Sequence, residues 1–240
     1  MYVVELSVSE AADRLGVTRA RVRSLLASGR LAGRHAGSLW RVDGDAVAQR
    51  LESVATAKGR PFSTRIAWSS AALLDGQDTS WLTTGERSRL HARLRQGDAQ
   101  TCRWRMQSRA STTRYRIADA DIDELISTRG VVLGGISAAG HYALGLGHGN
   151  EAEVYTDAAG QLIDEFFLVE SARGNLVLHS EIAGWHRKTS RTVNGVSVVP
   201  RLVVAADLLD SDDTRSRSAG DRLLKQILNS DALERAQRGS

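Results

Sequence analysis

The clearest chemistry in this 240-residue sequence belongs to arginine side chains placed at helical spacing near the start of the chain. Ala20 and Ser24 share one face of the predicted helix, Arg21 and Arg23 flank them, and Arg19 precedes them. Small side chains let a helix approach base edges closely, while guanidinium groups reach phosphates or guanine. The segment is therefore predicted to contact double-stranded DNA.

A second set of arginines lies in the middle of the chain. Residues 86–116 hold nine arginines and two acidic residues, and binding to phosphates would release counterions. A solvated basic face and a docking surface for an acidic protein are the other interpretations of this run. The side chains that we expect to form a second contact with nucleic acid are Arg87, Arg89, Arg93, Arg103, Arg105, Arg114 and Arg116.

The second half of the chain contains patterns that occur in enzymes. Gly134-Gly135 followed by Glu151 and Glu153 is similar to the nucleotidyltransferase signature, in which a glycine turn holds phosphates and paired acids hold Mg²⁺. The spacing is long, and a third strand acid is not evident. Residues 135–139 are only loosely similar to a nucleophile elbow, because the last glycine is replaced. We favour a buried glycine turn with surface glutamates, and we expect no enzymatic activity.

Metal and cofactor sites are not predicted. His141, His148, His179 and His186 lack an HxxxH or HExxH spacing, and the single cysteine, Cys102, excludes a thiolate zinc cluster. Scattered surface or partly buried histidines are the expected outcome.

Helix and turn signals place the first arginines. Ser7 and Glu10 form a capping box for a first helix that ends at Gly16, and Val17 is expected to enter the core. Thr18 caps the second helix, 19–28. Residues 34–42 read as two strands around a glycine turn, and a last helix begins at 45. We expect the DNA contacts of this domain to come from Thr18, Arg19, Ala20, Arg21, Arg23, Ser24, Arg34, His35 and Arg41.

The following segment repeats part of this pattern. Basic and apolar residues alternate over 102–106 and 113–117, which predicts a hairpin, and residues 115–122 echo residues 40–47. We therefore predict an α+β protein with tandem winged helix-turn-helix domains and a C-terminal mixed α/β domain. The expected boundaries are a first domain at 1–54, a linker at 55–61, a second, basic winged helix at 62–128 and an α+β domain at 129–240 for partner binding or oligomerisation.

Charge and hydropathy agree with a nucleic-acid-binding protein that is basic at one end. Residues 1–52 carry a net +2, residues 53–128 carry +4 and residues 129–240 carry −2. A signal peptide and a membrane-spanning run are not evident. We expect a cytoplasmic, nucleoid-associated protein without a membrane partner.

Residues 7–51 resemble the excisionase and MerR-like class of winged helix-turn-helix domains. The resemblance implies that helix 19–28 enters a major groove and that the wing touches the adjacent backbone. It is carried by Ser7, Ala11, Ala12, Leu15, Gly16, Val17, Val22, Leu26, Gly29, Leu31, Trp40, Val42 and Leu51.

The whole chain is similar to the AbiEi-like family of abortive-infection antitoxins. The similarity lies in residues 134–146 and in the closing pattern from Pro200 through Asp207 and Asp213 to Leu224. It implies an antitoxin that represses its own operon beside a nucleotidyltransferase-like toxin. The operator, that toxin and a second copy of the chain are the expected partners. The alternatives are a nucleotidyltransferase-like enzyme fused to DNA-binding modules and a basic protein-docking adaptor.

Overall fold

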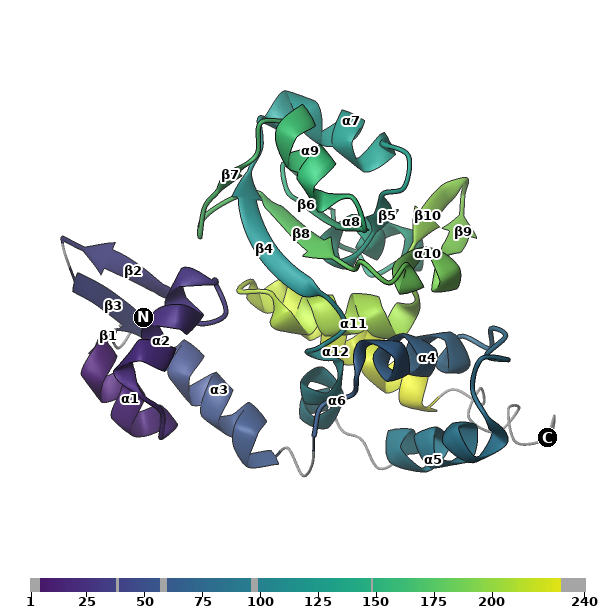
Figure 1. Ribbon diagram of the computed structural model, residues 1–240, viewed down its shortest axis with the longest axis horizontal. Coiled ribbons are helices and arrows are strands. Elements are labelled where there is room, and N and C mark those ends of the chain that lie inside the picture. Colours follow the sequence, from purple (N-terminus) through teal and green to yellow (C-terminus); the bar gives the residue numbers. More distant parts are fainter. Residues whose placement is uncertain (1–4, 38, 57–59, 96–98, 148, 230–240) are drawn as a thin grey trace. The chain divides into compact units, whose positions relative to one another are not determined.

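The computed structural model describes residues 5–37, 39–56, 60–95, 99–147 and 149–229, and the chain divides into two compact units, Met1–Lys58 and Gly59–Ser240 (Figure 1). Each unit has its own apolar core. The predicted linker at 55–61 begins inside a helix, because α3 continues to Thr56, and residues 57–59 lie outside the described residues.

The first unit is a three-helix domain with a small antiparallel sheet in the order β1-β3-β2. The wing strands and the three helices were predicted, whereas β1, which pairs with β3, was not. The elements are β1 (Glu5–Ser7), α1 (Val8–Leu15), α2 (Arg19–Ala27), β2 (Gly33–Ala36), β3 (Leu39–Asp43) and α3 (Gly44–Thr56).

Apolar residues at helical spacing hold this unit together. Val22, Leu25 and Leu26 share one face of α2 and are buried. Gly33 at the start of β2 lies against α2, since a Cβ there would meet Leu26 Cδ2 at 2.6 Å. Val17 is 38% exposed, so its expected place in the core is wrong. The turn between α1 and α2 therefore leaves this side chain at the surface.

The second unit is built on a seven-stranded mixed sheet in the order β7-β4-β8-β6-β5-β10-β9. Its strands are β4 (Ser111–Arg116), β5 (Val132–Leu133), β6 (Ala152–Thr156), β7 (Val169–Glu170), β8 (Leu176–Ser180), β9 (Arg191–Val193) and β10 (Val196–Val198). Its α-helices are α4 (Thr64–Leu74), α5 (Thr84–Arg95), α6 (Ala99–Met106), α7 (Ile122–Ser127), α8 (Gly135–Ala139), α9 (Ala159–Glu165), α10 (Trp185–Thr189), α11 (Arg201–Asp210) and α12 (Thr214–Asn229). Two 3-10 turns, η1 (Asp119–Asp121) and η2 (Gly140–Tyr142), precede α7 and follow α8.

The hairpin predicted over residues 102–106 and 113–117 is wrong. Residues 102–106 belong to α6, in which Cys102 and Met106, four positions apart, are buried. The other predicted strand, β4, pairs antiparallel with β8, with Thr113 opposite Leu178. Apolar residues at i and i+4 form one face of a helix and also fit the alternation of a strand, so the local pattern does not separate the two.

This pairing removes the wing of the expected second winged helix. β4 lies inside the large sheet, between β7 and β8, and α4 and α6 both pack against α11. The described residues of 62–128 therefore share one core with the strands and helices after residue 129.

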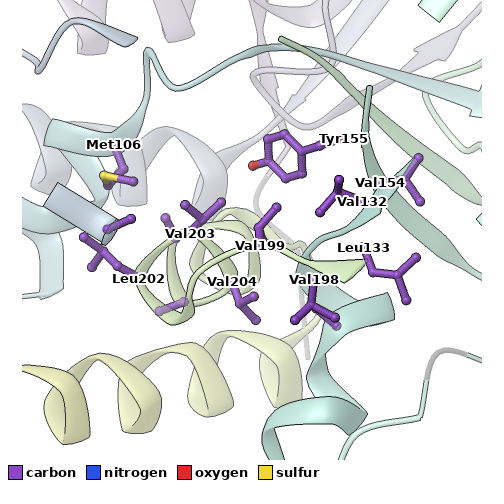
Figure 2. Packing of buried hydrophobic residues seen from close by; sticks show 14 of the residues in the cluster. Met106, Val132, Leu133, Val154, Tyr155, Val198, Val199, Leu202, Val203 and Val204 are labelled. Carbon is purple, nitrogen blue, oxygen red and sulfur yellow. The ribbon is translucent and has the colours of Figure 1, made fainter. Parts of the chain in front are cut away.

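Figure 2 shows the centre of that core, where α11 lies beneath the strands and the Tyr155 side chain points toward it. Met106 of α6 packs in the same cluster as Leu202 of α11. The labelled side chains that fill this region are Met106, Val132, Leu133, Val154, Tyr155, Val198, Val199, Leu202, Val203 and Val204.

Candidate nucleic-acid interface and a buried polar cluster

The recognition helix α2 is fixed at both ends by its own sequence. Ser7 and Glu10 form the predicted capping box on α1, and hydrogen bonds from Ser7 lower the pKa of Glu10. Gly16 ends α1 in the left-handed conformation, with φ +64°. Thr18 Oγ1 then accepts from Arg21 N at 3.2 Å. This bond gives the Thr18 hydroxyl a capping role in addition to the DNA contact that we predicted for it.

The outer face of α2 carries the predicted DNA-contacting side chains. Arg19, Ala20, Arg21, Arg23 and Ser24 are all exposed, on the side opposite the buried apolar face. Within the described part of the chain, none of the three arginines forms an ion pair or a side-chain hydrogen bond. Their guanidinium groups are therefore free to meet an external anion.

The wing presents a second, smaller set of polar groups. Arg34 lies opposite Arg41, and its Nε donates to Glu5 Oε1 at 2.7 Å. His35 lies opposite Trp40, with their ring centroids 3.9 Å apart. Arg41 is exposed. The pair with Glu5 compensates one wing charge, so Arg41 is the stronger candidate for a phosphate contact.

The arginines of the middle segment mostly have partners within the protein. Arg89 and Arg93 of α5 are exposed. The other five donate to Thr79 O (Arg87), Asp210 (Arg103), Arg93 O (Arg105), Gly174 O (Arg114) and Arg173 O (Arg116). Arg105 also lies over the Phe62 ring. Most of the middle arginines that were predicted to contact nucleic acid therefore have a structural role within the protein.

A cluster of buried polar side chains lies between the sheet and α11 and was not predicted as a unit. Asp207 Oδ1 is 2.7 Å from Arg109 Nη2 and accepts from Tyr155 Oη at 2.6 Å. Burial raises the pKa of Tyr155 well above its usual value. Asp207 Oδ2 accepts from Gly135 N at 3.0 Å. The cluster thus joins the loop after α6 to β6, α8 and α11.

The same cluster continues to β8 and to the start of β4. His179 Nε2 lies 2.9 Å from Glu153 Oε1, and its Nδ1 lies 2.8 Å from Thr112 Oγ1. The His179 ring stacks on Tyr155, with centroids 4.3 Å apart. Glu153 Oε2 accepts from Ile136 N at 3.2 Å.

These contacts explain the Gly134-Gly135 pattern. A Cβ on Gly135 would lie 1.7 Å from Glu153 Oε2, and one on Gly134 would lie 2.7 Å from the Tyr155 ring. The turn amides that would hold a phosphate already donate to Asp207 and Glu153. Glu151 is exposed, as expected, but Glu153 is buried in β6, so its expected place at the surface is wrong. The two glutamates therefore do not form the paired magnesium site of the signature.

The histidines named in the sequence do not converge. His179 belongs to the cluster, whereas His186 contacts Glu181, and burial lowers its pKa. His141 is half-buried in η2, and His148 lies outside the described residues. Glu153, His179 and Asp207 bring potential ligand atoms within 4.8 Å of one another. The Asp207 carboxylate already binds Arg109 and Tyr155, and the Glu153 carboxylate binds His179 Nε2. These ligand atoms are therefore engaged within the protein, and the cluster does not suit a cation.

Two protein families match the chain, one in each of its two units. Residues 5–54 match the model of a helix-turn-helix domain. Residues 88–229 match a family described as transcriptional regulator, AbiEi antitoxin, type IV toxin–antitoxin system. The second match extends across residue 128, in agreement with the continuous sheet. No curated protein and no solved structure matches the chain.

In the described ranges, no helix has the length and apolar content needed to cross a bilayer.

The two family matches make the protein a DNA-binding transcriptional regulator of the antitoxin type. More than half of the chain lies within the second match, and the chain belongs to the AbiEi family of antitoxin regulators.

Proposed function

We propose that the protein represses its own operon by placing α2 in the major groove of an operator. The observation that carries this proposal is the set of free guanidinium groups on Arg19, Arg21 and Arg23, opposite the face that anchors α2 in its core. Ala20 and Ser24 between them leave room for base edges, as in direct readout by a recognition helix. The protein would accordingly be found with the nucleoid.

The wing and α5 would add phosphate contacts. Arg41 and His35 on the wing would meet the backbone beside the groove. From the second predicted set, we retain Arg89 and Arg93 as contacts with nucleic acid, because both side chains are exposed on α5. Each phosphate contact adds affinity that falls with salt and carries no sequence information.

A binding experiment tests the operator contact. Binding of the full chain to its upstream DNA and to a random duplex would be measured across salt concentrations. Arg23→Ala should cost about 1–3 kcal/mol on the upstream DNA and little on the random duplex. Arg222→Ala, at an exposed position of α12, is the matched control and should change neither affinity. Equal losses on both duplexes would make Arg23 a phosphate contact only.

We further propose that the regulator acts as a homodimer and that it counteracts a nucleotidyltransferase-like toxin encoded beside it. A single recognition helix reads a short site, and two-fold operators solve this with two half-sites one helical turn apart. The family match supports a toxin partner in the operon. Sedimentation with and without operator DNA tests the dimer, and growth of cells that express the neighbouring gene with and without this chain tests the antitoxin role.

A further inference from the structure

We propose that Thr112 is a base-activated hydroxyl that accepts an acyl group from a small activated ester. Thr112 is an exposed residue at the start of β4, and its Oγ1 lies 2.8 Å from Nδ1 of the buried His179. His179 Nε2 lies 2.9 Å from the carboxylate of Glu153. A hydroxyl, an imidazole and a carboxylate in hydrogen-bonded series are the groups that activate nucleophiles in acyl transfer.

The hydrogen bonds fix which nitrogen of His179 carries the proton. An ionised carboxylate can only accept, so Glu153 requires a proton on His179 Nε2. The neutral imidazole then has a bare Nδ1, which accepts the hydrogen bond from the Thr112 hydroxyl. The nitrogen of His179 that faces the Thr112 hydroxyl is therefore the unprotonated one, which can act as a base, and not the N–H.

Two carboxylates face the nitrogen of His179 that is turned away from Thr112. When His179 takes the proton of Thr112, the imidazolium faces Glu153 at 2.9 Å and Asp207 Oδ1 at 4.0 Å. Stacking on Tyr155 and burial hold the ring in place. Because these two carboxylates lie behind the imidazole, a neutral ester suits the site better than an anionic phosphoryl donor.

The residue that carries this hydroxyl is exposed near the start of β4. β7 pairs with Tyr115 and Arg116, and Ser171 N donates to Arg114 O, so these contacts lie toward the end of β4 and not at Thr112. Neighbouring hydroxyls on the same strand provide internal comparisons. Ser111 lies opposite Ser180 and Thr113 opposite Leu178, whereas Thr112 lies opposite His179.

The covalent step is a simple acyl transfer. Thr112 Oγ1 attacks the ester carbon and forms a new C–O bond, while the bond to the leaving alcohol breaks. The hydroxyl proton moves to His179 and then to the leaving group. Neither an oxidant nor a second reactant is required.

The test uses p-nitrophenyl acetate and the full chain. Trypsin releases residues 110–114 as one peptide, which contains Ser111, Thr112 and Thr113 as its hydroxyl residues. Its acetylation rate, followed by mass spectrometry, should be roughly 10²-fold higher in the native chain than in Thr112→Val, the size of general-base assistance. Thr112→Ser should keep the reaction, and the matched controls Ser111→Ala and Thr113→Val should react like the native chain.

Variants of the base separate activation from mere exposure. His179→Gln and Glu153→Gln should slow acetylation of the same peptide while circular dichroism shows a folded protein. If one of these variants fails to fold, the other still tests the base, and the comparison of Thr112→Val with Thr113→Val shows whether Thr112 is the acceptor. Acetylation of the native chain no faster than that of Thr112→Val, or equally fast acetylation of folded His179→Gln, would overturn the proposal.

Discussion

The charge of Asp207 should be among the largest single contributions to the stability of the second unit. Asp207 is 1% exposed and compensates Arg109, which is 4% exposed. In Asp207→Asn the guanidinium loses its most buried anionic partner, and the strong acceptor of Tyr155 Oη and Gly135 N is weakened. Removing one partner of a buried ion pair costs about 3–5 kcal/mol, a large part of the stability of a typical domain.

Urea unfolding followed by tryptophan fluorescence provides the assay. Trp68 is buried, donates to Arg109 O at 3.0 Å and packs edge-on against Tyr155, so it reports on this cluster. Asp210→Asn is the matched control. Asp210 also pairs with Arg109, but its side chain is 40% exposed, so its loss should cost no more than about 1 kcal/mol.

A double substitution distinguishes charge from packing. Arg109→Met combined with Asp207→Leu removes both charges, and well-packed apolar replacements of buried pairs are often neutral. We expect this variant to recover most of the stability lost in Asp207→Asn. If Asp207→Asn cost no more than Asp210→Asn, or if the double variant recovered nothing, the argument from a buried, compensated charge would be refuted.

Three further substitutions test close packing and capping. Gly33→Ala should destabilise the first unit by about 1–3 kcal/mol, because its Cβ would overlap α2; thermal unfolding of this unit would measure the loss. Gly135→Ala should cost the second unit about 3 kcal/mol or more, since its Cβ would overlap the Glu153 carboxylate; urea unfolding would show it. The hydrogen bond from Arg65 lowers the pKa of Glu86 from 4.5 to about 2. Its stabilisation is therefore present above pH 4.5 and lost toward pH 2, so urea midpoints of Glu86→Gln and the native chain should differ above this window and converge below it.

The first unit could be predicted almost completely because its signals are local. A capping box, a left-handed glycine and an apolar face at helical spacing each act within one or two turns of chain. Val17 departed from the prediction because its burial depends on how the two helices meet. β1 was missed because a three-residue strand has too short a pattern to recognise before its pairing with β3 is known.

The second unit was predicted less well because its decisive contacts are distant in sequence. β4 pairs with β8 more than 60 residues later, and Arg109 meets Asp207 almost 100 residues later. The pattern of residues 102–106 fits a half-exposed strand as well as one face of a helix. The packing of this segment against α11, which is distant in sequence, favours the helix. The sheet pairing, and not the local pattern, therefore determined how residues 62–128 are organised.

The Gly134-Gly135 turn shows why a local motif can identify a chemical preference without identifying a function. Glycines before a helix expose amides that bind an oxyanion, which is why the pattern is similar to a phosphate turn. In this chain the oxyanions are the carboxylates of Asp207 and Glu153, each within 3.2 Å of a turn amide. The similarity to a phosphate turn therefore reflects amides that bind an anion, and the rest of the chain supplies that anion from within the fold. Glu153 also binds His179, whose other nitrogen faces Thr112, so this carboxylate belongs both to the turn and to the proposed site at β4.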